Sequence, residues 1–506
     1  MRTVGGHSNH VLVVGAGLAG LAAALHLAGR GREVTVVERE SWPGGRAGRA
    51  DIDGYRLDTG PTVLTMPDII DEAFAAVGET LSSRVELLPL EPAYHAVFAD
   101  GTSLDVHSDV NRMAAAVEDF ADPEQAAGYR SLREWLNRLY RIEFDSFIAA
   151  NFDSPLALLT PQLARIAALG AFRNWDRMVR RHITDARLRR VFTFQSLYAG
   201  VAPQNALAAY AVIAYMDTVS GVFFPRGGVR ALPDALAAAA TRAGVRFLYG
   251  RTVTELERSG DRVTAVRTDH DEQICCDAVI LTTELPQTYR LLGRKPRRLL
   301  ALRSSPSAVV VHVGCRSLPP TTAHHNILFG GAWEETFTDI IRDGQLMRDP
   351  SLLVTRPTAS DPTLAPTRRD LLYVLAPAPN LTRGNLDWTC IKAPYADNLI
   401  TTVEKRLLPG LRDDADILDV VTPADWAQKG MAAGSPFALS HTFAQTGPFR
   451  PANMVRGLQN AVLAGSSTVP GVGVPTALIS GRLAADRITG IATRSRTHFP
   501  MKAGTP

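Results

Sequence analysis

The sequence predicts an α/β fold, and three features of the 506-residue chain lead to this prediction. Near the N-terminus, "HVLVVGAGLAGLAAALHL" reads as an apolar strand, a glycine-rich turn and a helix, the order found in strand–helix units of parallel sheets. From residue 221 onward, short β-type runs such as "VRFLYG", "AVILTT" and "AVVVHVG" alternate with turns and helical pieces. Residues 111–220, rich in Ala, Leu, Arg and aromatic side chains, read as mostly helical. A chain of this length holds about two or three domains.

Composition and charge exclude several classes of protein. The 54 Lys and Arg residues nearly balance the 51 Asp and Glu residues, so the net charge of +3 gives no reason to expect nucleic-acid binding. The four cysteines form no C-x-x-C pair and no ligand-spaced set with histidine, which indicates a reduced, cytoplasmic protein without a structural metal site. The first ten residues lack the apolar core of a signal peptide. The apolar stretch 206–216 is too short to span a bilayer.

The glycine-rich turn after the first strand has the spacing of a dinucleotide-binding site, with Gly15, Gly17 and Gly20 in the order G-x-G-x-x-G. Gly15 allows the tight turn, Gly17 lets the backbone approach a pyrophosphate, and Gly20 permits close packing of the helix on the strand. The next strand, "EVTVVE", ends at Glu38, 23 residues after Gly15, where a carboxylate can accept hydrogen bonds from ribose hydroxyls. Because these parts occur together, we predict a Rossmann-like dinucleotide site rather than a glycine-rich turn without a ligand.

The residues after this strand favour FAD over NAD as the dinucleotide. A second glycine turn, Gly44-Gly45, carries Arg46, a cation that suits the second phosphate of a long, deeply held cofactor. The alternative for Arg46 is a surface arginine beside a turn. A further turn offers exposed backbone amides to the ribityl chain, and it consists of Gly60, Pro61 and Thr62.

By these motifs the sequence resembles the superfamily of flavin-containing amine oxidases and carotenoid desaturases. The stretch "GVFFPRGGVRALPDALAAAATRAGVRFLYGRTVTEL" at 221–256 is similar to that superfamily's return to the flavin domain, and the resemblance places Val253 at the adenine. Later stretches resemble the bacterial-type phytoene desaturases: "DPTLAP", "LLYVLAPAPNLTRGNLDWT", "GSPFALSHTFAQTGPFRPAN" and "GSSTVPGVGVPTALISG". The resemblance runs from about residue 10 to residue 490, with Thr363 and Thr476 in place of the expected Ser and Gly.

The last of these stretches is expected to close over the cofactor. In the family that the sequence resembles, the C-terminal strand returns to the first domain, so Gly465, Ser466 and the turn Gly473-Val474-Pro475 would cover the ribityl and isoalloxazine parts of FAD. Their backbone amides and the N-terminus of the following helix can stabilise negative charge on the flavin as it is reduced. The alternative is a plain connection between a strand and a helix.

The resemblance also implies how the chain is divided into domains. We expect a Rossmann-like FAD-binding domain assembled from three discontinuous segments, a substrate-binding domain with a mixed sheet, and a helical subdomain that faces the membrane. The FAD-binding domain is expected at 8–75, 221–290 and 455–495, the substrate-binding domain at 76–110 and 291–454, and the helical subdomain at 111–220.

The resemblance implies an enzyme that desaturates phytoene, a C40 hydrocarbon, toward lycopene by successive hydride transfers to FAD. A hydrocarbon offers no hydrogen-bonding group, so we expect a long apolar tunnel. No second G-x-G-x-x-G is present for a nicotinamide, and the resemblance implies oxygen or a quinone as the electron acceptor. The alternatives are another carotenoid-acting flavoenzyme (a later-step or C30 desaturase, or a ketolase), a non-catalytic isoprenoid-binding escort protein and, against the later motifs, an amine oxidase.

Candidates for an assisting acid or base are few. Glu134 in "LREWLNRLY" lies among apolar residues, which would raise the pKa of its carboxyl group. The flavin is the main catalytic group, and Glu134 is the candidate side chain that assists it. The alternative is an ordinary surface pair with Arg138. His324 and His325 could form a proton relay or bind a metal, although a structural pair is favoured because no further ligand stands at a useful spacing. Asp217, at the end of an apolar run, reads as a helix-end or turn residue.

A lipophilic substrate has to be collected from a membrane, and one segment has a matching composition. Residues 173–192 hold seven arginines against two aspartates, with apolar residues between them. Such a basic amphipathic surface can lie in the headgroup region and attract anionic lipid. The alternative is a solvated helical face that packs on the body of the protein. We therefore expect a cytoplasmic protein that associates peripherally with the cytoplasmic membrane.

Overall fold

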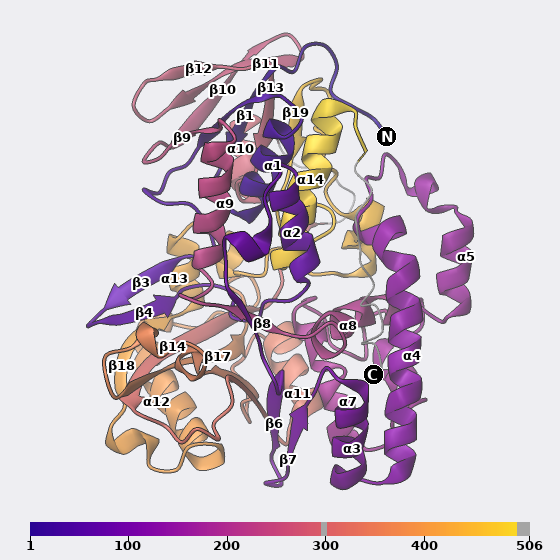
Figure 1. The fold of residues 1–506 in the computed structure, drawn as a ribbon, viewed down its shortest axis with the longest axis vertical. Helices are drawn as coiled ribbons and strands as arrows, with labels where there is room; N and C mark the ends of the chain where they lie inside the picture. Colours follow the sequence, from indigo (N-terminus) through magenta and orange to yellow (C-terminus); the bar gives the residue numbers. More distant parts are fainter. Residues whose placement is uncertain (295–300, 493–506) are drawn as a thin grey trace.

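The computed structural model describes residues 1–294 and 301–492, and its elements confirm the predicted α/β class (Figure 1). In the view of Figure 1, a parallel sheet with its helices lies at the top, a mixed sheet lies at the lower left and a helical part lies at the lower right. Residues 295–300 of the predicted substrate-binding domain and 493–495 of the predicted FAD-binding domain lie outside the described residues.

The parallel sheet is assembled from three distant parts of the chain. Its strand order is β19-β13-β1-β2-β9, and all neighbours run parallel. The strands are β1 (His10–Val14), β2 (Glu33–Val37), β9 (Arg246–Leu248), β13 (Ala278–Leu281) and β19 (Ala461–Leu463). The run VLVV of β1 is buried throughout, as expected for a strand that is covered on both faces. Each of the three segments predicted for the FAD-binding domain contributes at least one strand to this sheet.

The helices of this domain approach one another closely at glycine positions. They are α1 (Leu18–Ala28), α2 (Pro67–Ala75), α9 (Ala231–Arg242), α10 (Leu285–Leu291) and α14 (Val474–Thr489). Helix α14 packs beside α1 (Figure 1). A Cβ atom at Gly481 would lie 2.1 Å from the carbonyl oxygen of Ala19, so only glycine permits this approach. Gly20 has the packing role predicted for it, because a Cβ atom there would lie 2.0 Å from the carbonyl oxygen of Gly15.

Smaller antiparallel sheets accompany the parallel sheet. They are the antiparallel sheet of β10 (Val253–Ser259), β11 (Arg262–Thr268) and β12 (Gln273–Cys275), the hairpin of β3 (Arg49–Ile52) and β4 (Tyr55–Asp58), and the pair of β5 (Leu87–Pro89) and β8 (Phe223–Pro225). Because β5 pairs with β8, the chain leaves for the helical part and returns from it at neighbouring positions.

The mixed sheet forms one wall of the substrate-binding domain, in the order β18-β14-β17-β16-β15-β6-β7. Its strands are β6 (Tyr94–Phe98), β7 (Ser103–Val106), β14 (Ser307–Arg316), β15 (His325–Phe329), β16 (Leu352–Thr355), β17 (Arg369–Ala378) and β18 (Asp416–Val421), accompanied by helices α11 (Trp333–Phe337), α12 (Trp388–Arg406) and α13 (Pro423–Gln428). Side chains alternate along β14: Val309 and Val311 pack in the same core as α12 residues, whereas Val310 lines the large cavity described below.

The helical subdomain is built around the long helix α4. Its helices are α3 (Val110–Phe120), α4 (Pro123–Glu143), α5 (Pro161–Ala168), α6 (Trp175–Val179), α7 (Ala186–Val191) and α8 (Val212–Thr218). Helix α4 begins where the side chain of Asp122 accepts the backbone N–H of Gln125 (2.7 Å), with proline in the first helical position. No helix of the described residues is long and apolar enough to cross a membrane.

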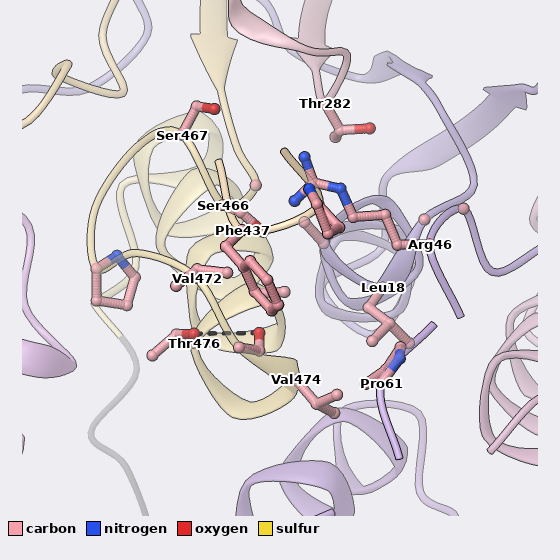
Figure 2. Close-up of a pocket in the computed structure, with 18 of the residues that line it drawn as sticks. Leu18, Arg46, Pro61, Thr282, Phe437, Ser466, Ser467, Val472, Val474 and Thr476 are labelled. Atoms are coloured by element: carbon pink, nitrogen blue, oxygen red, sulfur yellow. Dashed lines mark hydrogen bonds between the residues drawn. The ribbon is translucent and has the colours of Figure 1, made fainter. Parts of the chain in front are cut away.

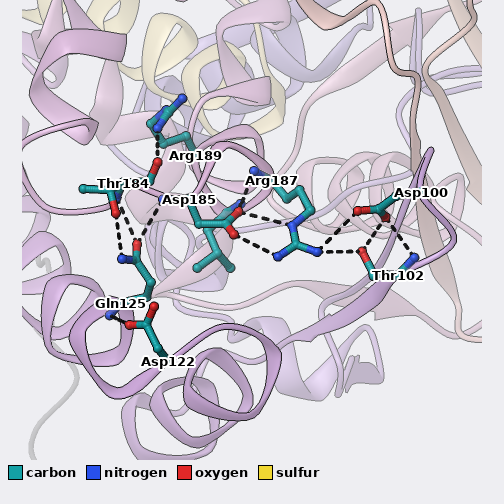
Figure 3. A network of polar contacts seen from close by, with 9 residues as sticks. Asp100, Thr102, Asp122, Gln125, Thr184, Asp185, Arg187 and Arg189 are labelled. Atoms are coloured by element: carbon teal, nitrogen blue, oxygen red, sulfur yellow. Dashed lines mark hydrogen bonds and ion pairs between the residues drawn. The ribbon is translucent and has the colours of Figure 1, made fainter.

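The structure corrects the prediction that residues 173–192 form a free amphipathic face. The apolar side chains of this segment are buried: Trp175, Met178, Val179, Leu188 and Phe192. Its polar groups bond to the body of the protein (Figure 3), since Arg187 pairs with Asp185 (2.9 Å) and with Asp100 (3.3 Å). Asp185 in turn caps helix α7. The alternative interpretation therefore holds: the segment packs its apolar stripe against the body of the protein, and no apolar stripe is left to insert into lipid.

Candidate functional site

One cavity of about 1210 Å³ extends from the glycine turn after β1 to the helical subdomain. Fifteen of the sixteen residues predicted to bind the cofactor line it: Gly15, Gly17, Glu38, Gly44, Gly45, Arg46, Gly60, Pro61, Thr62, Val253, Gly465, Ser466, Gly473, Val474 and Pro475. The sixteenth, Gly20, lies in α1 against the turn and packs there rather than facing the cavity. The fold therefore brings residues from all three sequence segments to one cavity.

Glu38 holds the glycine turn in shape. It is buried just beyond the end of β2, where Oε2 accepts the backbone N–H of Ala16 (2.7 Å) and Oε1 accepts that of Glu40 (2.9 Å). Gly15 has a φ of +106°, and a Cβ atom there would lie 2.3 Å from Oγ1 of Thr282. Each carboxylate oxygen of Glu38 retains acceptor capacity, so it can also receive hydroxyl donors from a ligand in the cavity.

Arg46 reaches into the cavity from the second glycine turn (Figure 2) and forms an ion pair with Glu284, a residue that sequence reasoning did not identify. Glu284 follows β13 and also lines the cavity. Its Oε2 atom is buried and has no hydrogen-bond partner within the described part of the chain. Such an atom costs about 1–3 kcal/mol, which a ligand hydroxyl donating to it would offset.

The C-terminal turn closes another side of the cavity (Figure 2). The backbone N–H of Gly465 donates to Oγ of Ser480 on α14 (3.0 Å). Thr476, which departs from the family pattern, donates its hydroxyl to the carbonyl of Gly473 (3.1 Å), and this bond joins the turn to the helix. Helix α14 begins at Val474, so the positive end of its dipole faces the cavity.

Beyond these turns the cavity wall is mainly apolar. The helical subdomain contributes side chains that include Phe147, Ile148, Ile166, Val212, Ile213 and Met216. Two further lining residues, Phe172 and Phe443, are exposed on the protein surface, so the cavity opens to the surface beside them. The wall therefore has the apolar character that the sequence predicted for a hydrocarbon tunnel.

Two buried carboxyl groups line this apolar part. Glu143 ends helix α4, and burial raises the pKa of its carboxyl group well above the usual range. Asp217 lies in α8, where Oδ2 accepts the hydroxyl of Tyr94 (3.1 Å) and Oδ1 accepts Nε2 of Gln195 (3.3 Å). Burial raises the pKa of Asp217 to about 8, against the opposing effect of these two hydrogen bonds.

The prediction that Glu134 assists catalysis is wrong. Its side chain lies on the exposed side of α4 and does not line the cavity. The buried side of this helix includes Leu132, Leu136 and Leu139, and the same spacing of three to four residues leads to Glu143. Asp217 lies at the end of α8, as predicted for a helix-end residue, but the sequence did not show that it is buried and lines the cavity. Glu143 and Asp217 could both have been found in the sequence by one signal, a carboxylate that continues the apolar face of its helix.

His324 and His325 form a buried structural pair. Nδ1 of His324 lies 2.7 Å from Oγ of Ser360, and Nδ1 of His325 lies 2.9 Å from Oγ1 of Thr355. Burial lowers the pKa of His325 to about 3, so its ring is neutral at physiological pH. Residues 1–294 and 301–492 contain no cluster of three or more side chains suited to holding a metal ion.

Comparisons with known proteins agree with this geometry. The family of flavin containing amine oxidoreductases matches residues 18–489. The chain is 61% identical over 492 residues to a phytoene dehydrogenase of Streptomyces griseus, with 97% of each chain covered. It is 36% identical to a zeta-carotene-forming phytoene desaturase of Myxococcus xanthus (94% of this chain and 93% of the relative covered). A lycopene-forming phytoene desaturase of a Paracoccus species is 32% identical (94% and 96% covered).

A solved structure shows the same fold. A putrescine oxidase variant superimposes with a TM-score of 0.62 at 17% identity, covering 94% of this chain and 98% of the oxidase. The fold and the cavity thus define an FAD-dependent oxidoreductase. The chain belongs to the flavin containing amine oxidoreductase family, in the carotenoid desaturase branch that contains these relatives.

The residues of the cavity fit FAD. Glu38 supplies acceptors for the adenosine ribose, and Arg46 carries five N–H donors, enough for a phosphate as well as for its ion pair. The buried Oε2 atom of Glu284 lacks the donor that a cofactor hydroxyl would provide. At the other end of the cofactor, the N-terminus of α14 and the turn before it offer positive potential to the flavin ring.

Proposed function

We propose that this protein desaturates phytoene toward lycopene in an FAD-dependent step of carotenoid biosynthesis. The observation that carries the proposal is the continuity of one cavity, in which the cofactor turns and the apolar wall enclose the same space of about 1210 Å³. A hydrocarbon lying against the apolar wall reaches the cofactor end without crossing bulk water. The substrates in the names of the relatives support a C40 polyene as the occupant.

Bound FAD supplies the hydride acceptor for this chemistry. The residues of the chain bind and orient the substrate: apolar side chains of the wall remove it from water at about 25 cal/mol per Å² of buried surface. Small side chains of the mixed sheet, Ala308 and Val310, leave room along one side of the cavity. The backbone at the start of α14 stabilises negative charge that develops at the cofactor end.

Other carotenoid-acting flavoenzymes remain the alternative to this proposal. A later-step or C30 desaturase, or a ketolase, would use the same cofactor turns and differ in the substrate that the apolar wall accepts. An isoprenoid escort protein has no need of the buried acceptor at Glu284 or of the Arg46 turn. The sequence contains no second nucleotide motif, which supports oxygen or a quinone as the electron acceptor.

Expression in a bacterial host that accumulates phytoene tests the proposal. We expect phytoene to be consumed and coloured polyenes to appear, and the positions of their absorption bands count the desaturation steps. The purified protein is expected to carry FAD. Unchanged phytoene in the presence of flavin-loaded protein would contradict the substrate and favour a later-step enzyme.

We further propose that the protein docks on the cytoplasmic face of the membrane at the open end of the cavity. Four large apolar side chains are exposed in short turns or beside them, and they form the docking patch: Leu156 (74% exposed), Leu159 (75%), Phe172 (46%) and Phe443 (63%). Phe172 and Phe443 also line the cavity. Arg165 and Arg173 are exposed close to these residues in the chain, and each arginine near an anionic surface contributes about 1 kcal/mol.

Removing the apolar side chains of the docking patch is expected to weaken membrane binding. In the triple variant Leu156→Ser, Leu159→Ser, Phe443→Ser, we expect at least about a tenfold loss of co-sedimentation with vesicles of phosphatidylglycerol and phosphatidylcholine, because each lost side chain removes up to about 1.5–3 kcal/mol of burial. The control is Ile417→Ser, an equally apolar residue that is 48% exposed on β18. Equal binding of the triple variant and the control would exclude the patch.

A further inference from the structure

The apolar part of the cavity contains one carboxyl group that is held by two hydrogen-bond donors. We propose that Asp217 is a catalytic residue that accepts the proton released in each desaturation, an inference that rests on the proposed function. The argument depends on where the side chain lies, how it is oriented and which groups surround it.

The orientation of Asp217 is fixed by elements from two sides. Tyr94 on β6 donates its hydroxyl to Oδ2 at 3.1 Å, and Gln195 in the turn Phe194–Leu197 donates Nε2 to Oδ1 at 3.3 Å. The carboxyl group is 2% exposed to solvent, yet Asp217 lines the cavity. Each oxygen retains acceptor capacity because each of these side-chain hydrogen bonds uses one lone pair.

A chain of contacts connects Asp217 to the cofactor end of the cavity. The ring of Tyr94 packs against that of His325, with 5.8 Å between centroids. Nδ1 of His325 lies 2.9 Å from Oγ1 of Thr355, which in turn donates to Oγ1 of Thr62 at 3.4 Å. Thr62 belongs to the turn predicted to contact the ribityl chain of FAD and lines the same cavity. Contacts through three intervening side chains therefore link Asp217 to a turn at the cofactor end.

The proposed step balances in atoms and electrons. One C–H bond of the substrate breaks, and its hydride leaves with both electrons for the oxidised flavin that the enzyme class supplies. The resulting positive charge is spread over the adjacent double bonds. The C–H bond on the neighbouring carbon then breaks, its electron pair forms the new C=C bond, and its proton passes to the carboxylate of Asp217. The carboxylate also stabilises the positive charge before the proton leaves, since the two lie in a medium of low dielectric constant.

Asp217 suits this role better than Glu143, which is also buried and lines the apolar part of the cavity. Burial is the sole cause that raises the pKa of Glu143 well above its usual range, so this group is a neutral acid at physiological pH. Hydrogen bonds from Tyr94 and Gln195 favour the ionised form of Asp217 and offset part of the cost of burial. A base that titrates near the working pH transfers protons most effectively.

The titratable groups that face Asp217 stay neutral near pH 8, so Asp217 is the group among them that titrates there. Tyr94 and Tyr198 face it, and burial raises the pKa of both hydroxyl groups, so they stay neutral. His325, behind Tyr94, has its pKa lowered by burial to about 3 and is also neutral. Only the ionised carboxylate can accept a proton, so the rate should rise with pH and level off above the pKa of about 8.

Stopped-flow reduction of the holoenzyme by its hydrocarbon substrate in vesicles, without oxygen, tests the role. We expect Asp217→Asn to slow flavin reduction by about 100-fold or more and to abolish the rising limb of the pH profile. Tyr94→Phe removes a donor to the ionised form, so the limb should move to higher pH. Glu143→Gln should keep the limb where it is. The flavin spectrum and melting temperature of each variant report whether it is folded.

Infrared difference spectra supply a readout that needs no turnover. The band of the Asp217 carboxylic acid is the one present in the wild-type holoenzyme and missing from Asp217→Asn. As the pH rises, this band should disappear with a midpoint near pH 8. An unchanged rate and pH limb in Asp217→Asn, an unshifted limb in Tyr94→Phe, or the absence of this band would overturn the role of Asp217 alone. Wild-type protein that is not reduced by phytoene or by a later carotenoid would overturn the proposed function, and this role with it.

Discussion

Gly481→Val is expected to destabilise the FAD-binding domain. A Cβ atom at this position would lie 2.1 Å from the carbonyl oxygen of Ala19 and 2.8 Å from the backbone nitrogen of Ala23. Helix α14 would have to move away from α1, and both helices are buried almost throughout. Because backbone atoms rather than flexible side chains obstruct the new group, we expect the free energy of unfolding to fall by about 3 kcal/mol, the upper end for overpacking. Thermal unfolding and the flavin content of the purified protein measure this effect.

The matched control is Ala238→Val on helix α9 of the same domain. Ala238 is exposed, so the substitution costs only the helix propensity of valine, about 0.5 kcal/mol. A Gly481→Val protein with the melting temperature and flavin content of this control would contradict the close packing of α14 on α1.

Glu38→Ala is expected to raise the dissociation constant of FAD by about 100-fold. The substitution removes the acceptors of two ribose hydroxyls and leaves the backbone N–H of Ala16, now bonded at 2.7 Å, without its partner. Hydrogen bonds to a charged group contribute about 1.5–3 kcal/mol, and about 2.8 kcal/mol corresponds to a factor of 100 in affinity. Titration of the flavin-free protein with FAD, followed by quenching of flavin fluorescence, gives the dissociation constant.

Glu33→Ala provides the control for charge, because Glu33 is exposed at the start of the same strand. We expect this variant to bind FAD as the wild-type protein does. If Glu38→Ala bound FAD as tightly as this control, the cofactor would have to lie away from the glycine turn.

The cofactor end of the site could be predicted from the sequence because it depends on short backbone turns. The spacing of Gly15, Gly17 and Gly20 and the carboxylate of Glu38 lie within one strand–turn–helix–strand unit, whose geometry is set locally. The return of the C-terminal strand came from the family resemblance, and β19 does join the same sheet as β1. The α/β class followed from the N-terminal strand–turn–helix unit together with the β-type runs after residue 221 and the helical stretch 111–220.

Residues whose environment comes from long-range contacts could not be predicted in this way. Glu284 lies 238 positions from Arg46, and nothing in the local sequence shows that the two side chains meet. Asp217 receives its hydrogen bonds from Tyr94, 123 positions away, and from Gln195. Glu134 was selected from its neighbours in sequence, whereas the periodicity of α4 decides that it faces outward.

The basic segment 173–192 shows a second limit of sequence patterns. An apolar stripe on a short helix has the same appearance whether it faces lipid or the protein core. Here the stripe is buried, and the exposed apolar residues lie instead in or beside single 3-10 turns, at Leu156, Leu159 and Phe443. A single turn is too short to carry a repeating pattern that would mark it as a membrane contact.

The position of β19 and α14 in the chain has a consequence for biosynthesis. Strand β19 pairs with β13, and roughly 180 residues separate Leu281 from Ala461. At a synthesis rate of about 5–20 residues per second, the ribosome needs roughly ten to forty seconds to make this stretch. During that time the N-terminal part of the sheet exposes an unpaired edge strand and the apolar side of α1 to solvent. Newly made chains are therefore expected to need protection by a chaperone until α14 has emerged from the ribosome, and flavin capture follows the docking of this helix.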